Sequence, residues 1–260
     1  MELYLGSGGF SYPYWRGVFY PPGLKPSDYL WHYSRHFNAV EVNASYYHVP
    51  TAKTFASMVE RSQGRVRFAI KLHRSLTHSR DADDRLYERL FAAVEPLVEA
   101  GVMGPFAAQF PYSFQRTPAN RRYLANLTAR FAGWELAVEL RHRSWAVEPV
   151  WRAFREAGLI WISADYPSLP GLPNSGLVVT GEVAYLRFMG RNAEKWWDHQ
   201  TREERYDYLY SEDELRPYVR RLVELAGGLR GAWVIFHNTP EGKALVNLRQ
   251  FASLWRELAG

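Results

Sequence analysis

The chain places carboxylate and amine side chains at the ends of several short apolar runs. Two carboxylates held close together can act as general acid and general base when their surroundings separate their pKa values, and a buried lysine can join such chemistry. We therefore predict catalytic roles for Glu41, Lys71, Glu139 and Asp165. Ligand-binding side chains occur in the same regions: Tyr12, Trp15, Asn43, Tyr47, Gln109, Arg141, Arg187, Trp197, His237 and Asn238.

Eight apolar runs separated mostly by helical periodicity could position these residues. This alternation is typical of repeated βα units around a parallel sheet, and eight such units close into a barrel of about 250 residues. We therefore predict the α/β class, with an eight-stranded parallel (β/α) barrel of TIM type as one domain over residues 1–260. The runs are Leu3–Ser7, Ala39–Asn43, Arg67–Lys71, Phe106–Phe110, Leu136–Arg141, Leu159–Asp165, Ala184–Phe188 and Trp233–His237.

Alternation within the runs indicates which side chains point into the barrel. Parallel strands covered on both faces are usually continuously apolar, yet polar residues alternate with apolar ones in 40–43 and 136–141. The polar ends of the strands should meet at the carboxyl end, where barrel enzymes keep their active sites. The predicted inward residues are Glu41, Asn43, Ala69, Lys71, Ala107, Gln109, Ala137, Glu139, Arg141, Ser163, Asp165, Tyr185 and Arg187.

Barrel dimensions place the carboxyl groups of Glu41 and Glu139 about 5–7 Å apart, which spans both glycosidase geometries. Lys71 and Arg141 could hold one carboxyl ionised while burial raises the pKa of the other. The acids, together with His237, are also hard ligands suited to divalent metals. Because nearby basic residues already supply positive charge, we predict no metal site and no cofactor, and keep a divalent metal as the alternative.

Aromatic residues crowd three predicted loops that open on the same end of the barrel. They occur in residues 9–23, at Tyr46 and Tyr47, and in residues 196–210. Rings beside arginine at a barrel mouth can stack on sugar rings or unstacked bases. They can equally pack together as a lid, and the sequence leaves both interpretations open.

The helical segments show two irregularities. No amphipathic segment follows the sixth strand, where residues 166–175 contain three prolines, so we expect the sixth helix to be missing or reduced. The seventh βα loop, Gly190–Ser211, is about four times the usual length. We expect it to be a mobile lid that closes on a ligand. The predicted helices are Ser27–His36, Ala52–Arg61, Asp83–Glu99, Pro118–Phe131, Val147–Ala157, Glu212–Ala226 and Leu245–Leu258.

Composition narrows the classes of function. The net charge of +5 favours anionic partners, and arginine supplies 27 of the 32 basic residues. The absence of cysteine excludes disulfides, thiolate metal sites and a cysteine nucleophile. The sequence contains no run of 18 apolar residues, which is the length that a membrane-spanning helix needs. The first predicted strand begins too early to leave room for a signal peptide. We therefore expect a cytoplasmic protein.

Several motifs resemble those of one known family. They include Gly6–Tyr12, Trp15–Pro21, Phe37–Tyr47, Phe68–Lys71, Gln109–Pro111, Glu139–Trp145, Tyr185–Gly190, Tyr210–Leu215 and Phe236–Asn238. Over almost its whole length the chain resembles the YecE-like family, also called domain of unknown function seventy-two. The resemblance implies the barrel fold and supplies no established reaction.

Together these observations predict an enzyme that performs acid–base chemistry on an anionic, hydroxylated ligand, such as a sugar phosphate or a nucleotide unit. Hydrolase, lyase and isomerase activities all fit. One alternative is a module that binds single-stranded nucleic acid without turnover, and another is a metal-dependent hydrolase or lyase. The expected partner is a small anionic ligand or nucleic acid; we expect no membrane, and the sequence indicates no protein partner.

Overall fold

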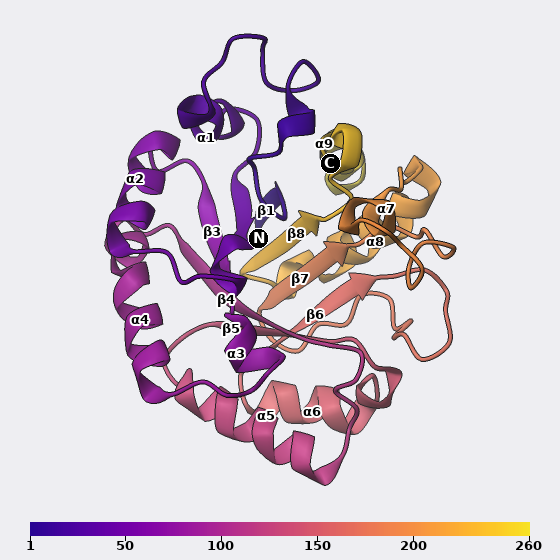
Figure 1. Ribbon diagram of the computed structural model, residues 1–260. Helices are drawn as coiled ribbons and strands as arrows, with labels where there is room; N and C mark the ends of the chain where they lie inside the picture. The colour runs from indigo at the N-terminus through magenta and orange to yellow at the C-terminus, as the bar shows by residue number, and fades with distance from the viewer.

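Eight parallel strands form a closed barrel in the order in which they occur in the chain (Figure 1). The computed structural model describes the backbone of residues 1–260 and every side chain except that of Arg202. The predicted fold class is therefore confirmed. The strands are β1 Glu2–Ser7, β2 Ala39–Val42, β3 Arg67–Lys71, β4 Met103–Phe110, β5 Leu136–Leu140, β6 Ile160–Asp165, β7 Val183–Phe188 and β8 Gly231–Phe236.

Helices surround the barrel and cover the outer faces of its strands. Four of these helices begin after a side chain that caps the first turn. The capping residues Thr51, Asp83, Thr117 and Ser211 each accept a hydrogen bond from a backbone N–H of that turn. Residues 166–182 join β6 to β7 without a helix, as predicted. The helices are α1 Tyr29–Tyr33, α2 Ala52–Ser62, α3 Arg74–Thr77, α4 Asp84–Glu99, α5 Pro118–Arg130, α6 Glu148–Glu156, α7 Arg202–Tyr206, α8 Glu212–Leu225 and α9 Lys243–Ala259.

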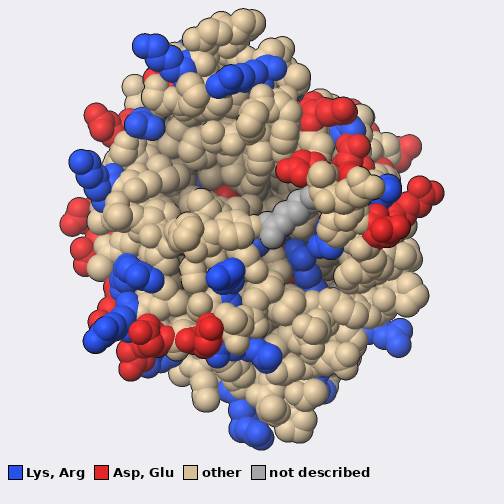
Figure 2. Space-filling view, in the orientation of Figure 1, with Lys and Arg blue, Asp and Glu red and all other residues tan. Residues whose placement is uncertain are grey.

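The surface carries charges of both signs. In Figure 2, acidic side chains gather at the upper right, while acidic and basic side chains lie side by side at the left and lower left of this face. The net charge of +5 therefore produces no extended basic surface on the side shown. No helix among the described residues is long and apolar enough to cross a membrane.

The barrel interior is filled by small and branched side chains in its lower layers. Four alanines on β2 to β5 pack against larger residues on β6 to β8, which include Ile162, Tyr185 and Trp233. This packing corrects one prediction. On β6 the inward residues are Ile160 and Ile162, so the polar residues Ser163 and Asp165 face the outer layer instead of the interior.

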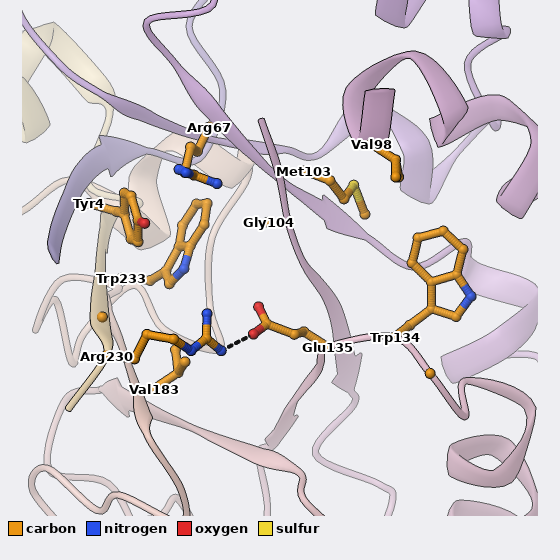
Figure 3. A pocket seen from close by; sticks show the side chains of 12 residues that line it. Tyr4, Arg67, Val98, Met103, Gly104, Trp134, Glu135, Val183, Arg230 and Trp233 are labelled. Carbon is orange, nitrogen blue, oxygen red and sulfur yellow. Dashed lines mark hydrogen bonds and ion pairs between the residues drawn. The ribbon is translucent and has the colours of Figure 1, made fainter. Parts of the chain in front are cut away.

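The amino end of the barrel holds a smaller cavity of about 350 Å³ (Figure 3). Trp233 and Tyr4 pack against each other there, with ring centroids 4.9 Å apart. A side chain at Gly104 would collide with the Trp233 ring, so the glycine makes room for it. Arg230 forms an ion pair with Glu135 across this end. The polar residues predicted from the strand ends lie elsewhere.

Candidate functional site

A cavity of about 600 Å³ opens at the carboxyl end of the barrel. Its floor is formed by polar residues at the ends of several strands, and its walls come from the loops after β1, β2 and β3 and from the long loop after β7. The lining residues are Gly8, Tyr12, Tyr14, Asn43, Tyr46, Tyr47, Lys71, His78, Gln109, Arg141, His199, Glu203, Arg205, Tyr206, His237 and Thr239.

Two of the predicted catalytic acids are buried and share one arginine. Arg187 Nη2 lies 2.6 Å from Glu41 Oε2, and Arg187 Nη1 forms an ion pair with Glu139. Tyr185 and Tyr166 donate further hydrogen bonds, of 2.7 Å to Glu41 and 2.6 Å to Glu139. The three charged side chains are at most 1% exposed. This cluster therefore neutralises most of its own charge inside the barrel.

Both carboxyl groups are held ionised. Burial alone would raise the pKa of Glu41, but the charges of Arg187 and His237 outweigh burial and keep that pKa well below its usual range. Burial has the same effect on Glu139, where the charges of Arg141 and Arg187 keep the pKa low. Neither residue lines the cavity. This placement does not support the predicted acid–base pair of Glu41 and Glu139, because both acids already accept hydrogen bonds from Arg187.

Basic residues form the cavity surface directly above these acids. Arg141 donates a 2.5 Å hydrogen bond to Glu139 and is 12% exposed. Lys71 donates a 2.8 Å hydrogen bond to Gln109 Oε1, and its amine lies 4.9 Å from the centroid of the Tyr46 ring. Burial, followed by the charges of the neighbouring arginines, lowers the pKa of Lys71 to about 8. A substantial fraction of this amine is therefore neutral near pH 8.

His237 connects the cavity to the buried acids. Its Nε2 lies 3.3 Å from Glu41 Oε1, within ion-pair range but without hydrogen-bond geometry. Burial lowers the pKa of His237 more than Glu41 raises it, so the imidazole is mainly neutral at pH 7. Gly8 makes this position possible, because a Cβ there would lie 2.5 Å from His237 Nδ1. The imidazole can therefore exchange protons with a bound molecule.

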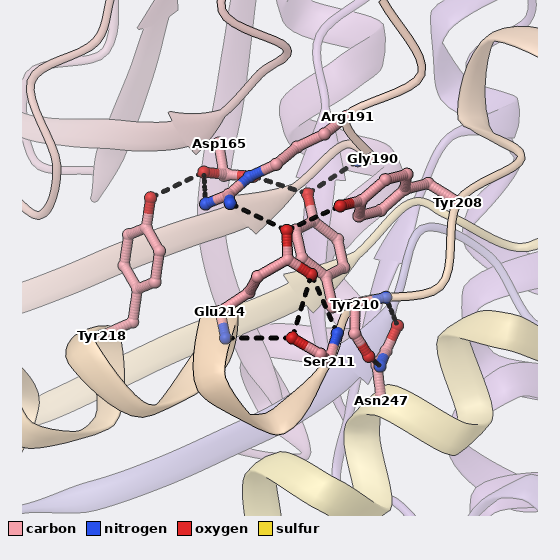
Figure 4. Close-up of polar contacts among 9 residues, drawn as sticks. All are labelled: Asp165, Gly190, Arg191, Tyr208, Tyr210, Ser211, Glu214, Tyr218 and Asn247. Carbon is pink, nitrogen blue, oxygen red and sulfur yellow. Dashed lines mark hydrogen bonds and ion pairs between the residues drawn. The ribbon is translucent and has the colours of Figure 1, made fainter.

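Asp165 lies outside the cavity and anchors the long loop instead (Figure 4). Arg191 binds both of its carboxylate oxygens at 2.8 Å. Tyr210 and Tyr218 each donate a 2.7 Å hydrogen bond to it. The predicted inward position of Asp165 is wrong, because Ile160 and Ile162 of β6 point into the barrel and the alternating residues, including Asp165, point outward. Its contacts give it a structural role at the base of the loop.

The loop after β7 covers one side of the cavity. Trp196 is buried against Tyr166, with ring centroids 5.6 Å apart, and so packs beside the hydroxyl group that binds Glu139. Farther along the loop, His199, Glu203, Arg205 and Tyr206 reach the cavity. The loop therefore has the position expected of a lid, while its predicted mobility stays a prediction.

The other predicted ligand-binding residues separate into two groups. Tyr12, Tyr47, Asn43 and Gln109 line the cavity, as Arg141 and His237 do. The structure does not place the remaining residues on it. Trp15 is buried and donates a hydrogen bond to the Thr239 carbonyl, while Asn238 donates to the Tyr208 carbonyl and to Asn247. Arg187 is buried beneath the floor of the cavity, and Trp197 is 51% exposed beside Tyr112.

Several cavity residues were absent from the predicted site. His78 follows β3, and burial together with Lys71 lowers its pKa to about 4. Arg205 and His199 come from the lid, and Arg205 Nε and His199 Nδ1 are buried without a hydrogen-bond partner. The sequence places His78 shortly after the third apolar run, but only the folded loop shows that Arg205 and His199 reach the cavity.

The acids and histidines do not gather into a metal-binding group. Among the described residues, no cluster of three or more His, Asp or Glu side chains is arranged to hold a metal ion. Glu41 and Glu139 bind Arg187, while Asp165 binds Arg191 on the outer side of the strand. These carboxylates therefore do not fit the divalent-metal alternative.

Comparisons with known proteins place this chain in a family. Residues 4–259 match the profile described as protein of unknown function DUF72. The UPF0759 protein YunF of Bacillus subtilis is 29% identical over 251 residues, which cover 90% of this chain and 89% of YunF. The UPF0759 protein YecE of Escherichia coli is 30% identical over 145 residues, covering 54% of this chain and 48% of YecE.

Solved structures show the same architecture. A DUF72 family protein from Thermotoga maritima superposes with a TM-score of 0.89 at 37% identity, covering 98% of this chain and 100% of the other. A second DUF72 family protein, from Enterococcus faecalis, has a TM-score of 0.86 at 23% identity, covers 98% and 95% of the two chains, and supports the fold alone. The chain belongs to the DUF72 family.

Proposed function

We propose that this protein is an enzyme that performs acid–base chemistry on a small, anionic, hydroxylated molecule in the cavity at the carboxyl end of its barrel. One observation carries the proposal: the cavity surface is cationic, although the strands that form it also carry carboxylates. Those carboxylates lie below the surface and are paired, whereas Lys71, Arg141 and Arg205 line the cavity and Glu203 is its one acidic lining residue among the described side chains.

Anion binding is supported by the unused hydrogen-bonding capacity of the cavity. Arg205 Nε and Asn43 Oδ1 are buried without a partner among the described residues. Buried polar atoms in folded proteins are rarely left unpaired, so Arg205 Nε is suited to donate to an anion and Asn43 Oδ1 to accept from a hydroxyl group of the same ligand. A phosphate or carboxylate can accept hydrogen bonds from Arg205, and Arg141 adds a second positive charge.

Proton transfer is supported by two titratable groups on the cavity, both with a pKa that burial lowers. His237 Nε2 lies 3.3 Å from Glu41 Oε1, and the charge of Glu41 would stabilise the imidazolium form. Lys71 has a pKa of about 8 and faces the same cavity. Glu41 therefore acts through His237 in this proposal, and Glu139 orients Arg141 through its 2.5 Å hydrogen bond.

The chemical character of the remaining walls suits hydroxyl groups and sugar rings. The tyrosines Tyr12, Tyr14, Tyr46 and Tyr47 line the cavity together with the amides of Asn43 and Gln109. Aromatic faces pack against the C–H surfaces of sugars, and amides bind their hydroxyl groups. A sugar phosphate combines the anionic and hydroxylated parts that these walls favour.

Calorimetric titration with ribose 5-phosphate tests the binding part of this proposal. We expect wild-type protein to bind it and Arg205→Ala to bind at least about tenfold more weakly, because a charge-assisted hydrogen bond is lost. Arg152→Ala is the matched control, since Arg152 is exposed on α6. Equal affinity of wild type and Arg205→Ala would contradict the proposal.

The same titration separates the nucleic-acid alternative. A binding module for single strands would prefer an oligonucleotide over the sugar phosphate, with an affinity that falls steeply as salt increases, and would lose about 1–3 kcal/mol per stacked ring. Of the loop aromatics considered for stacking, Tyr208 already donates a 2.6 Å hydrogen bond to Glu214. Trp197 is the more exposed probe, and Trp197→Ala should leave ribose 5-phosphate binding unchanged.

A further inference from the structure

Lys71 differs from the other lysines of the chain. Its amine points into the cavity, and no carboxylate of a described residue lies within ion-pair distance of it. Lys195 pairs with Glu204, and Lys243 pairs with Asp207 and Glu241. The two remaining lysines, Lys25 and Lys53, are exposed. Among the lysines that the structure describes, Lys71 is thus the one that combines enclosure in a cavity with the absence of a carboxylate partner among the described residues.

The contacts of Lys71 orient its amine without keeping it charged. Gln109 Oε1 accepts one hydrogen bond, but an amide cannot take up the proton as a carboxylate would. Burial and the two guanidinium groups of Arg141 and Arg187 disfavour the ammonium form, and the buried acids offset this only in part. Neutral lysines in such surroundings act as nucleophiles toward carbonyl groups.

We propose that Lys71 forms an imine with the carbonyl group of the bound anion, so that the substrate class is an aldehyde or ketone that carries a phosphate or carboxylate. This inference rests on the proposed function for the anionic part of the ligand. The arrangement of a neutral amine beside Arg141 and Arg205 matches a molecule with a carbonyl at one end and an anionic group at the other.

The chemical step is balanced without an oxidant or a cofactor. The lone pair of Lys71 Nζ attacks the carbonyl carbon, the C=O π electrons move to oxygen, and a proton passes from nitrogen to that oxygen. The hydroxyl of the resulting carbinolamine then takes a proton that comes from solvent water through the imidazole of His237, and leaves as water while a C=N bond forms. Glu41 and Glu139 offset part of the cost of the positive charge on the resulting iminium ion.

An imine at this position would determine the class of reaction. The iminium withdraws electrons from the neighbouring carbon, so a C–H or C–C bond at that carbon becomes easier to break. A base is then needed to take up the released proton, and His237, which burial keeps mainly neutral, faces the same cavity. Isomerase and lyase reactions therefore follow from the proposal more directly than hydrolysis does.

Trapping with sodium borohydride tests the imine directly. Wild-type protein is incubated at pH 8 with glycolaldehyde phosphate, reduced with borohydride, digested and mapped by mass spectrometry. We expect a reduced adduct on Lys71, at least tenfold more abundant than on any of the other four lysines. Near pH 7 the neutral fraction of Lys71 should exceed that of an exposed lysine by roughly two orders of magnitude.

Variants and a second measurement keep the result interpretable. Lys71→Met should form no adduct at a cavity residue while retaining the circular dichroism of wild type, and Lys53→Met should leave trapping at Lys71 unchanged. Excess inorganic phosphate should reduce trapping at Lys71 severalfold. Equal labelling of all five lysines, or absence of an adduct on Lys71, would overturn the proposal.

The titration with ribose 5-phosphate separates this proposal from the one on which it rests. If that compound binds and depends on Arg205, but no adduct forms on Lys71, the imine is contradicted and the anion site stands. If Lys71 is trapped selectively although Arg205→Ala binds the sugar phosphate as wild type does, the imine is supported and the anion site is contradicted.

Discussion

The buried guanidinium of Arg187 lies between two carboxylates that would otherwise be unpaired charges inside the barrel. It forms ion pairs with both Glu41 and Glu139, and tyrosine hydroxyl groups supply further hydrogen bonds. Burial of a charge without a partner costs far more than burial of a well-paired cluster. At the residue scale, the two acids that resemble a catalytic pair in the sequence therefore form buried ion pairs, and they contact Arg141 and His237 on the cavity surface.

Replacement of Arg187 tests this structural role. Arg187→Met leaves both carboxylates buried without their main partner, and we expect the free energy of unfolding to fall by about 3–5 kcal/mol. Arg155→Met removes an exposed ion pair with Glu148 and should change that free energy by no more than about 1 kcal/mol. Urea denaturation of the two variants measures both values. Equal small losses would show that the Arg187 cluster contributes no more than a surface pair.

For Lys71 we predict the opposite effect on stability, since its replacement should stabilise the protein. Because its pKa is lowered to about 8 in the folded protein, the unfolded chain binds more protons than the folded one between about pH 8 and pH 10. Wild-type stability should therefore rise through that range from this group, and Lys71→Met should lack the rise.

Lys71→Met should consequently be more stable than wild type by about 1–2 kcal/mol at pH 7, after allowance for the lost hydrogen bond to Gln109. The difference in unfolding free energy between the two proteins should shrink toward pH 10. Urea denaturation at both pH values measures it. A less stable variant at pH 7 would indicate that the ammonium group is not disfavoured in the cavity.

At the scale of elements, the strands and most helices were predictable because each has its own sequence pattern. The run Ala39–Asn43 alternates strictly, and Glu41 faces the interior as that pattern requires. The run Leu159–Asp165 is apolar at most positions, so its facing depends on packing. Ile160 and Ile162 fill the interior, which turns Asp165 toward α8.

The site was predictable only in part. Residues at strand ends, such as Lys71 and His237, lie on the cavity as expected. Pairing between Arg187 and the two acids depends on the relative register of three strands, which a single sequence does not reveal. Arg205 comes from a loop whose path is set by contacts such as those of Asp165, and those contacts arise only in the folded chain.

Asp165 gives the prediction for the lid. Asp165→Ala removes the acceptor for Arg191, Tyr210 and Tyr218, and should lower the free energy of unfolding by about 3 kcal/mol. Hydrogen exchange over residues 190–211 should accelerate, because the base of the loop loses its anchor. Tyr218→Phe removes a single hydrogen bond and should cost about 1 kcal/mol. Unchanged exchange in Asp165→Ala would show that other contacts hold the loop.

At the scale of the whole molecule, the two ends of the barrel differ in a way that indicates where chemistry takes place. The amino end is packed around Trp233, and Arg230 there is paired with Glu135. The carboxyl end presents a larger cavity with basic and titratable residues on its surface and the acids beneath it. This asymmetry follows from the parallel arrangement of the strands, which brings all of their carboxyl ends to one side.

A crystal structure of the protein soaked with ribose 5-phosphate would test the central claim most directly. We predict that the phosphate lies in the cavity at the carboxyl end, within hydrogen-bond distance of Arg205 or Arg141, and that the sugar carbon chain extends toward Lys71 and His237. Phosphate bound outside that cavity, or a cavity that stays without ligand at saturating concentration, would contradict it.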